Sequence, residues 1–124
     1  MGTKYKILVV EDEQILREAY CQILTQEGYE VATATNGRLA LKQLKTFQPD
    51  LILLDILMPE MDGVTFLTLA KLTKNFPSVK VIAFSNLSDQ QKLDQMIALG
   101  VSENILKSTL SPKQLALTIQ SLLV

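Results

Sequence analysis

The feature that most constrains this chain is an apolar run, Leu51 to Leu54, that ends abruptly in Asp55. Four apolar residues without alternation are typical of a strand buried on both faces, which is the situation in a parallel sheet covered by helices. Pro59 cannot continue a central strand, and Gly63 after Asp62 favours a turn, so the chain leaves the sheet as a loop. The pattern predicts a carboxylate at the carboxyl edge of a sheet. Alone, Asp55 could equally well be a residue that only caps the following loop.

Strand and helix patterns alternate along the rest of the chain. Strands are expected at 5–10, 29–35, 51–55, 79–84 and 103–106, because each is rich in apolar or β-branched residues. Alternation at this pitch predicts one doubly wound α/β domain over 1–124, with five parallel strands and helices on both faces of the sheet. The five helices are expected up to Gly28, from Asn36–Gly37 to before Pro49, at about 64–74, from a capping box at Ser88–Gln91 up to Gly100, and from a second capping box at Ser111–Gln114 onward.

Composition excludes several classes of function. The chain has 124 residues, 48% hydrophobic and 20% charged, as in a globular domain. A net charge of −1 argues against nucleic-acid binding, and no apolar run is long enough to cross a membrane. No N-terminal signal pattern is visible, so we expect a cytoplasmic protein. With no histidine and a single cysteine, histidine-based sites and internal disulfides are excluded.

Polar groups of particular types follow four of the five expected strands. Glu11 and Asp12 follow the first, Asp55 ends the third, and Ser85 and Lys107 follow the fourth and fifth. Taken singly, Ser85 could be a turn residue, Lys107 a surface lysine, and Asp12 a helix cap. Together they fit phosphoryl transfer: close carboxylates need a cation such as Mg²⁺, and an aspartate can attack phosphorus. The lysine and the hydroxyl can stabilise phosphoryl oxygens.

With this set of residues, the whole chain resembles the receiver domain of bacterial two-component response regulators. The resemblance implies a flavodoxin-like fold with strand order 2-1-3-4-5. It implies that Asp55 is the phosphoacceptor and that Asp12 and Asp55 bind Mg²⁺ directly. Glu11 would contact the metal through water, and the backbone carbonyl of Leu57 would supply another ligand.

The resemblance also implies a switch, in which Ser85 moves to the phosphoryl group and Lys107 forms an ion pair with it. Two positions depart from the family pattern: Asn104 stands where an aromatic residue is common, and Ser108 follows the lysine in place of a cis-proline. A cis bond before a residue other than proline costs about 2.5–4 kcal/mol, so we expect a trans bond there. The phosphoryl chemistry is expected to be complete while the read-out is altered.

The implied phosphodonor is a sensor histidine kinase or a small acyl phosphate. The protein would be a signalling switch that acts only on itself, working through a downstream protein or through an effector domain beyond this sequence, and receivers often form homodimers. One alternative is a degenerate receiver that serves as a phosphorylation-independent interaction module. Another is a Mg²⁺-dependent phosphohydrolase, but enzymes of that type need a second acid where this chain has Leu57.

Overall fold

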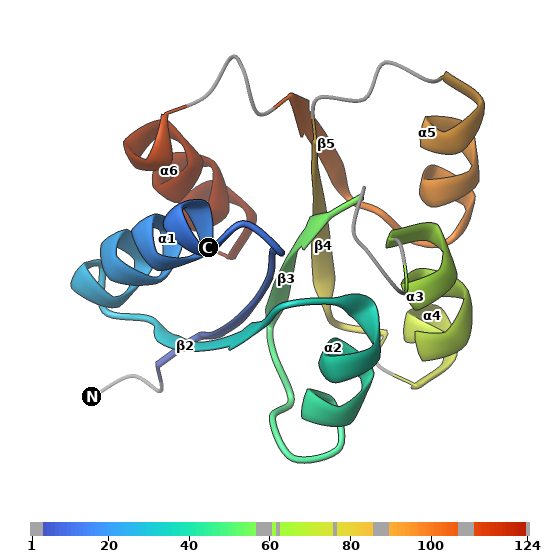
Figure 1. Cartoon of the computed structure of the whole chain (residues 1–124), viewed down its shortest axis with the longest axis horizontal. Coiled ribbons are helices and arrows are strands. Elements are labelled where there is room, and N and C mark those ends of the chain that lie inside the picture. Colours follow the sequence, from blue (N-terminus) through green and yellow to red (C-terminus); the bar gives the residue numbers. More distant parts are fainter. Residues whose placement is uncertain are drawn as a thin grey trace.

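The fold is built on a parallel sheet of five strands, in the order β2-β1-β3-β4-β5 (Figure 1). In this computed structural model the described residues are 4–56, 61, 63–75, 77–85, 90–106 and 111–123. The order matches the one expected for the sequence. The strands are β1 (Lys6–Val10), β2 (Glu30–Ala34), β3 (Leu51–Asp55), β4 (Lys80–Ser85) and β5 (Glu103–Leu106).

Helices cover both faces of the sheet, as predicted. On one face lie α1 (Gln14–Gln26) and α6 (Pro112–Leu123). On the other lie α2 (Gly37–Gln43), α3 (Gly63–Ala70), α4 (Leu72–Asn75) and α5 (Gln90–Ala98). Each face has its own apolar core, because neighbouring residues of a strand point to opposite sides. None of these helices is long and apolar enough to cross a membrane.

The central strands explain the apolar run at the start of the sequence analysis. All five residues of β3 are buried, and Ile7 to Val10 of β1 are buried as well. The edge strand β2 is different, because only Ala34 of its five residues is fully buried. Continuous apolar sequence therefore marks the strands that have a neighbour on each side and a helical layer on each face.

The third predicted helix is wrong in detail. The sequence favoured one helix over about 64–74, but the structure has two segments, α3 and α4, so the described residues contain six helical segments and not five. The break lies at Lys71, whose φ of 49° is in the left-handed region. A residue in that conformation cannot continue a right-handed helix, and no sequence pattern marks it. The second helix also ends early, at Gln43, and passes into turns before Pro49.

The sequence predicted the starts of α2 and α6 correctly but not the cap of α1. The box at Ser111 is confirmed: the Gln114 N–H donates to Ser111 Oγ at 3.2 Å, and the Ser111 N–H donates to Gln114 Oε1 at 3.0 Å. Asn36 caps α2, accepting from the Leu39 N–H at 2.9 Å. The cap of α1 is Glu13 and not Asp12, so that alternative for Asp12 is wrong. The box at Ser88 lies outside the described residues.

The capping box gives a direct test of α6. Replacing Ser111 by alanine removes the acceptor for the Gln114 N–H, so we expect the free energy of unfolding to fall by about 1 kcal/mol. Urea unfolding followed by circular dichroism measures the change. Ser121→Ala, on the same helix but near its end, is the matched control and should change stability by less than about 0.5 kcal/mol. Equal losses in both variants would show that Ser111 does not act as a cap.

Candidate functional site

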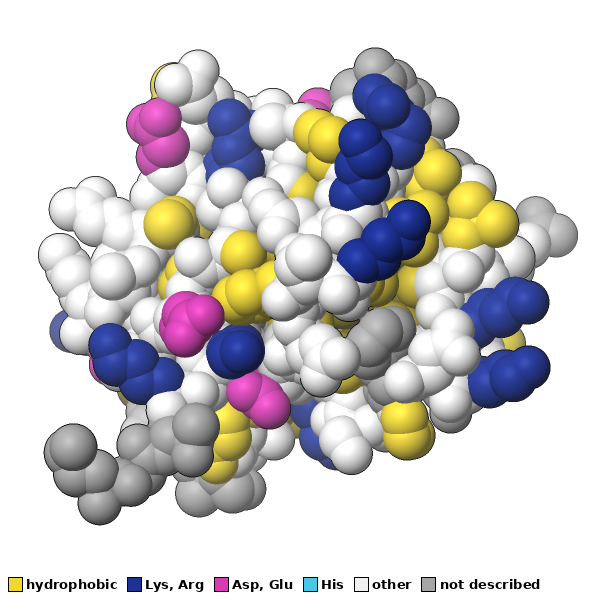
Figure 2. Space-filling model, turned by 90° about the horizontal axis from the view of Figure 1, so that it is seen from below, with side chains coloured by type: hydrophobic (Ala, Val, Ile, Leu, Met, Phe, Trp, Pro, Cys, Tyr) yellow, Lys and Arg dark blue, Asp and Glu magenta, His cyan; other side chains and the backbone are white. Residues whose placement is uncertain are grey.

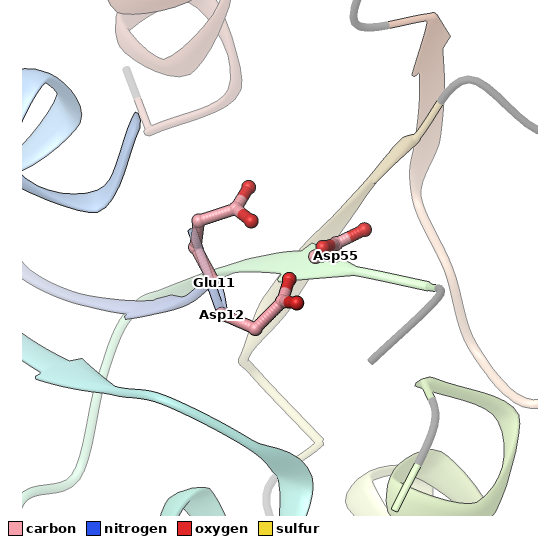
Figure 3. A group of neighbouring side chains, drawn as sticks. All are labelled: Glu11, Asp12 and Asp55. Carbon is pink, nitrogen blue, oxygen red and sulfur yellow. The ribbon is translucent and has the colours of Figure 1, made fainter. Parts of the chain in front are cut away.

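Three carboxylates meet at the carboxyl edge of the sheet. One oxygen from each of Glu11, Asp12 and Asp55 lies within 4.8 Å of the other two. Figure 3 shows the three side chains directed toward a common region, Glu11 and Asp12 from the end of β1 and Asp55 from the end of β3. Glu11 and Asp55 are only 2% and 4% exposed, whereas Asp12 is more open to solvent. The structure thus brings together the three acids that the sequence placed at strand ends.

The pairing of β1 with β3 accounts for this meeting. Val10 lies opposite Leu54 in the parallel register, so Glu11, which follows β1, and Asp55, the last residue of β3, come next to each other at one edge of the sheet. The Glu11 N–H still donates to the Ala34 carbonyl at 3.1 Å, which continues the ladder with β2 by one residue. The backbone of Glu11 is therefore held by the sheet although its side chain lies beyond it.

Arg17 is a residue of this site that the sequence analysis missed. Its Nη1 donates to the Glu11 carbonyl at 2.9 Å and to the Asp12 carbonyl at 3.3 Å. The side chain therefore ties α1 to the backbone that carries both acids. A signal was present, because a cation near a helix N-terminus is disfavoured by the helix dipole and needs a local reason.

The turn from the acids into α1 is fixed by Glu11 itself. The Glu13 N–H donates to Glu11 Oε2 at 3.1 Å, across two residues. This bond places one oxygen of the buried carboxylate and gives it a charge-assisted partner. Since Glu13 is the N-cap of α1, the position of the helix and that of the carboxylate depend on each other.

The chain after Asp55 returns closely to the strand end. The Gly63 N–H donates to the Ile56 carbonyl at 2.8 Å. A Cβ at Gly63 would lie 3.0 Å from Ile56 Cα and 3.2 Å from the Asp55 carbonyl oxygen, so the approach of α3 requires glycine here. Gly63, which the sequence marked only as part of a turn, thus lets α3 begin directly beside the candidate site.

The donor set fits a hard divalent cation. Three carboxylates at this separation repel one another unless a cation lies among them, and oxygen ligands of this kind suit Mg²⁺. The cluster of Glu11, Asp12 and Asp55 is therefore compatible with Mg²⁺ binding, while the ligand role expected of each acid stays a prediction. Leu57, the expected source of a carbonyl ligand, lies outside the described residues.

The remaining expected residues are placed only in part. Asp55 pairs with Phe84, so Ser85 follows at the same edge, and Ser85 in turn pairs with Leu106 at the end of β5. Lys107 comes next in the sequence but lies outside the described residues, as does Ser108. Ser85 and Asn104 are described as parts of their strands, without their side chains.

The pKa of Tyr20, a buried core residue, is affected by the charges of the site. Its ring lies edge-on to Phe84, with the centroids 5.3 Å apart. Burial raises the pKa of Tyr20 well above its ordinary value, and the charges of Glu11 and Asp55 raise it further. An ionised phenol is disfavoured here because it would be desolvated and would face like charges.

The raised pKa of Tyr20 predicts a loss of stability at alkaline pH. In the unfolded chain the phenol ionises near pH 10, whereas in the folded protein it stays protonated, so the free energy of unfolding should fall as the pH rises above about 10. Tyr20→Phe should make that fall shallower, as measured by urea unfolding between pH 8 and pH 11. The pKa of Tyr29 is also raised, mainly by burial, but Tyr29 is less buried, so Tyr29→Phe should have a smaller effect. An unchanged slope in Tyr20→Phe would contradict this.

Comparison with known proteins identifies the family. The profile of the response regulator receiver domain matches residues 7–120. The chain is 38% identical to the chemotaxis protein CheY of Treponema pallidum, over 86% of this chain and 74% of that protein. It is 41% identical to a protein-glutamate methylesterase/protein-glutamine glutaminase of Rhodospirillum rubrum, but over only 28% of that protein.

A solved structure agrees with the sequence matches. The chemotaxis protein CheY4 of Vibrio cholerae superposes with a TM-score of 0.87 at 27% identity, covering 97% of this chain and 99% of that one. The similarity therefore extends over the whole sheet and both helical layers, and it includes the edge where the carboxylates meet. The chain belongs to the response regulator receiver domain family, whose members act in phosphorylation-based signalling.

Proposed function

We propose that Asp55 accepts a phosphoryl group in a Mg²⁺-dependent reaction and that this modification switches protein contacts. The observation that carries the proposal is the meeting of Glu11, Asp12 and Asp55 at the ends of β1 and β3, in a chain of the receiver family. The donor would be the phosphohistidine of a sensor histidine kinase or a small acyl phosphate. Residues 1–124 would form one such domain.

The reaction is a displacement at phosphorus. A carboxylate oxygen of Asp55 forms the new O–P bond while the bond from phosphorus to the donor nitrogen or oxygen breaks, and the electron pair leaves with the donor. Asp55 is suited to this role because it is buried at the end of β3, where the sheet holds its backbone in one position. The product is an acyl phosphate on the protein.

The other acids would hold the cation. Asp12 and Asp55 would bind Mg²⁺ directly, Glu11 through water, and the Leu57 carbonyl would complete the protein ligands. Bound there, Mg²⁺ would neutralise phosphoryl oxygens as charge develops on them. Arg17 would not touch the cation. It is a positioning residue, because its two hydrogen bonds to the backbone carbonyls of Glu11 and Asp12 hold the segment that carries these acids.

Ser85 and Lys107 are proposed to recognise the phosphoryl group once it is attached. Support comes from the register: Ser85 follows the residue paired with Asp55, and Lys107 follows Leu106, the partner of Ser85. A hydroxyl could donate to one phosphoryl oxygen, and an ammonium group could pair with another. Ser85 would move to the phosphoryl group and Lys107 would form an ion pair with it, which is how a local modification becomes a change of shape.

The proposed partners are the kinase and a downstream protein or effector domain. A homodimer is a further proposed assembly, and the cytoplasm is the proposed compartment. The methylesterase of Rhodospirillum rubrum is much longer than this chain, and its name describes the whole of that protein. The match therefore supports the switch and not an enzymatic activity. The rival function, a receiver that interacts without phosphate, is separated by the experiment below.

The first test is whether Asp55 is phosphorylated. Wild-type protein incubated with acetyl phosphate and Mg²⁺ should gain one phosphoryl group by intact-mass spectrometry, and Asp55→Asn should gain none. Asp50→Asn is the matched control. Asp50 directly precedes β3, at the end of the strand opposite to Asp55, and its carboxylate accepts from the Lys6 N–H at 2.7 Å. It should be labelled like wild type. Removing Mg²⁺ with a chelator should abolish labelling.

The outcomes separate the two functions. Absence of labelling together with absence of Mg²⁺ binding, measured by calorimetry, would favour the phosphate-independent module. Absence of labelling despite Mg²⁺ binding would mean that acetyl phosphate is not a donor, and a histidine kinase would then be tested. Labelling of Asp55→Asn at the wild-type level would contradict the proposed acceptor.

A second test concerns the read-out. Because Asn104 replaces the aromatic residue common in receivers, we expect a weak response of β5 and its neighbours to phosphorylation. Beryllofluoride serves as a mimic of the phosphoryl group. Backbone amide chemical shifts recorded with and without it should differ strongly around Asp55 and little around residues 103–106. Asn104→Tyr should enlarge the response of that segment. A large response of the wild-type segment would contradict the expectation.

A further inference from the structure

Basic residues are concentrated on one side of the molecule. The chain has 12 basic and 13 acidic residues, yet no acid occurs within 31–49 or 63–88. These stretches contain α2, α3 and α4. We define the basic face as Arg38, Lys42, Lys45, Lys71 and Lys74, all of them exposed.

The members of the basic face are aligned. Arg38, Lys42 and Lys45 are spaced by four and three residues, which places them on one side of α2 and of the turn that continues it. The Lys45 N–H donates to the Lys42 carbonyl at 3.2 Å, so the turn keeps a helical course. Lys71 lies at the break between α3 and α4, and Lys74 lies within α4. The preceding helix, α3, packs against α2. Figure 2 shows several lysine and arginine side chains from the centre to the right of this view; in Figure 1, α2 lies at the bottom centre and α3 and α4 lie on the right.

A hollow lies beside the basic face. It has a volume of about 370 Å³ and opens between the edge strand β2 and α2, with Thr33, Thr35, Lys42 and Thr46 among its lining residues. Gln43 Nε2 donates to the Thr33 carbonyl at 3.2 Å, which fixes one wall. Hydroxyl groups and an ammonium group in one hollow can donate hydrogen bonds to a carboxylate.

We propose that the basic face docks an acidic segment of a partner protein, with one acidic side chain in the hollow beside Lys42. This surface goes beyond the proposed function, because none of its residues belongs to the carboxylate cluster. The electrostatic attraction between the basic face and an acidic segment acts only at short range. The whole chain has a net charge of −1, and physiological salt screens charges beyond about 8 Å. The target must therefore bring its negative charges into contact with α2.

The same features favour a protein over the two other anionic partners. Single-stranded nucleic acid is bound by exposed aromatic rings, and the aromatic residue within α2, α3 and α4 as described is Phe66, which is fully buried. Duplex DNA and anionic membranes attract domains with a broad positive field, which a net charge of −1 does not supply. A membrane surface cannot enter a hollow, whereas a side chain can.

The test compares two charge reversals of equal size. Lys42→Glu/Lys45→Glu reverses two charges of the basic face, and Lys4→Glu/Lys113→Glu reverses two exposed lysines elsewhere. The probe is a short fluorescein-labelled peptide of glutamate with interspersed leucine, titrated with full-length protein in fluorescence anisotropy. Duplex DNA and phosphatidylglycerol vesicles are titrated in parallel. Circular dichroism checks that both variants are folded.

The expected result is salt-sensitive peptide binding that the reversal on the basic face weakens by about tenfold or more, while the control reversal changes it by less than about twofold. Equal weakening by both reversals, or no peptide binding to wild type, would overturn the proposal. Binding of DNA or vesicles through the same lysines that is tighter than binding of the peptide would also overturn the proposal, and would identify nucleic acid or membrane as the partner. Acetyl phosphate labelling is measured separately, so loss of labelling in wild type would count against the phosphoryl switch and not against this surface.

Discussion

The parallel pairing of β1 with β3 is the constraint on which the rest of the structure depends. It sets Val10 opposite Leu54, and the next residues of both strands are then carboxylates at one edge. A shift of one residue would exchange the two faces of β3 and move Asp55 away from Glu11. Because both faces of β1 and β3 pack against apolar cores, such a shift would disrupt the side-chain packing of both cores, so core packing fixes the geometry of the site.

The site itself is costly, and neighbouring contacts hold it together. Two of its carboxylates are almost fully buried and repel each other, which would destabilise the fold without support. Arg17 and the N–H of Glu13, both at the start of α1, and the close return of Gly63 at the start of α3 supply that support. A cation or a phosphoryl group bound at this edge would change the balance of these contacts, which is what a switch requires.

Charge is distributed unevenly over the domain. Carboxylates lie at the ends of β1 and β3, and α2 and the α3–α4 segment carry basic residues without acids. The start of α2 also lies close to the chain that follows Asp55, since a Cβ at Gly37 would be 3.0 Å from Met61. A partner on the basic face would thus bind a helix whose first turn contacts Met61, six residues after Asp55. Phosphorylation and docking could then influence each other through one packed contact.

The sequence by itself determined which strands are central, which residues end them, and where α6 begins, because burial on two faces and capping leave local patterns. It also pointed to Glu11, Asp12 and Asp55 as one site, since parallel strands share an edge. Only the tertiary structure decided the break at Lys71, the cap of α1, the clamp by Arg17, and the hollow beside Lys42. The break at Lys71 and the cap of α1 depend on backbone angles at single residues, and the Arg17 contacts and the hollow depend on how particular side chains are brought together. None of these leaves a periodic trace in the order of residues.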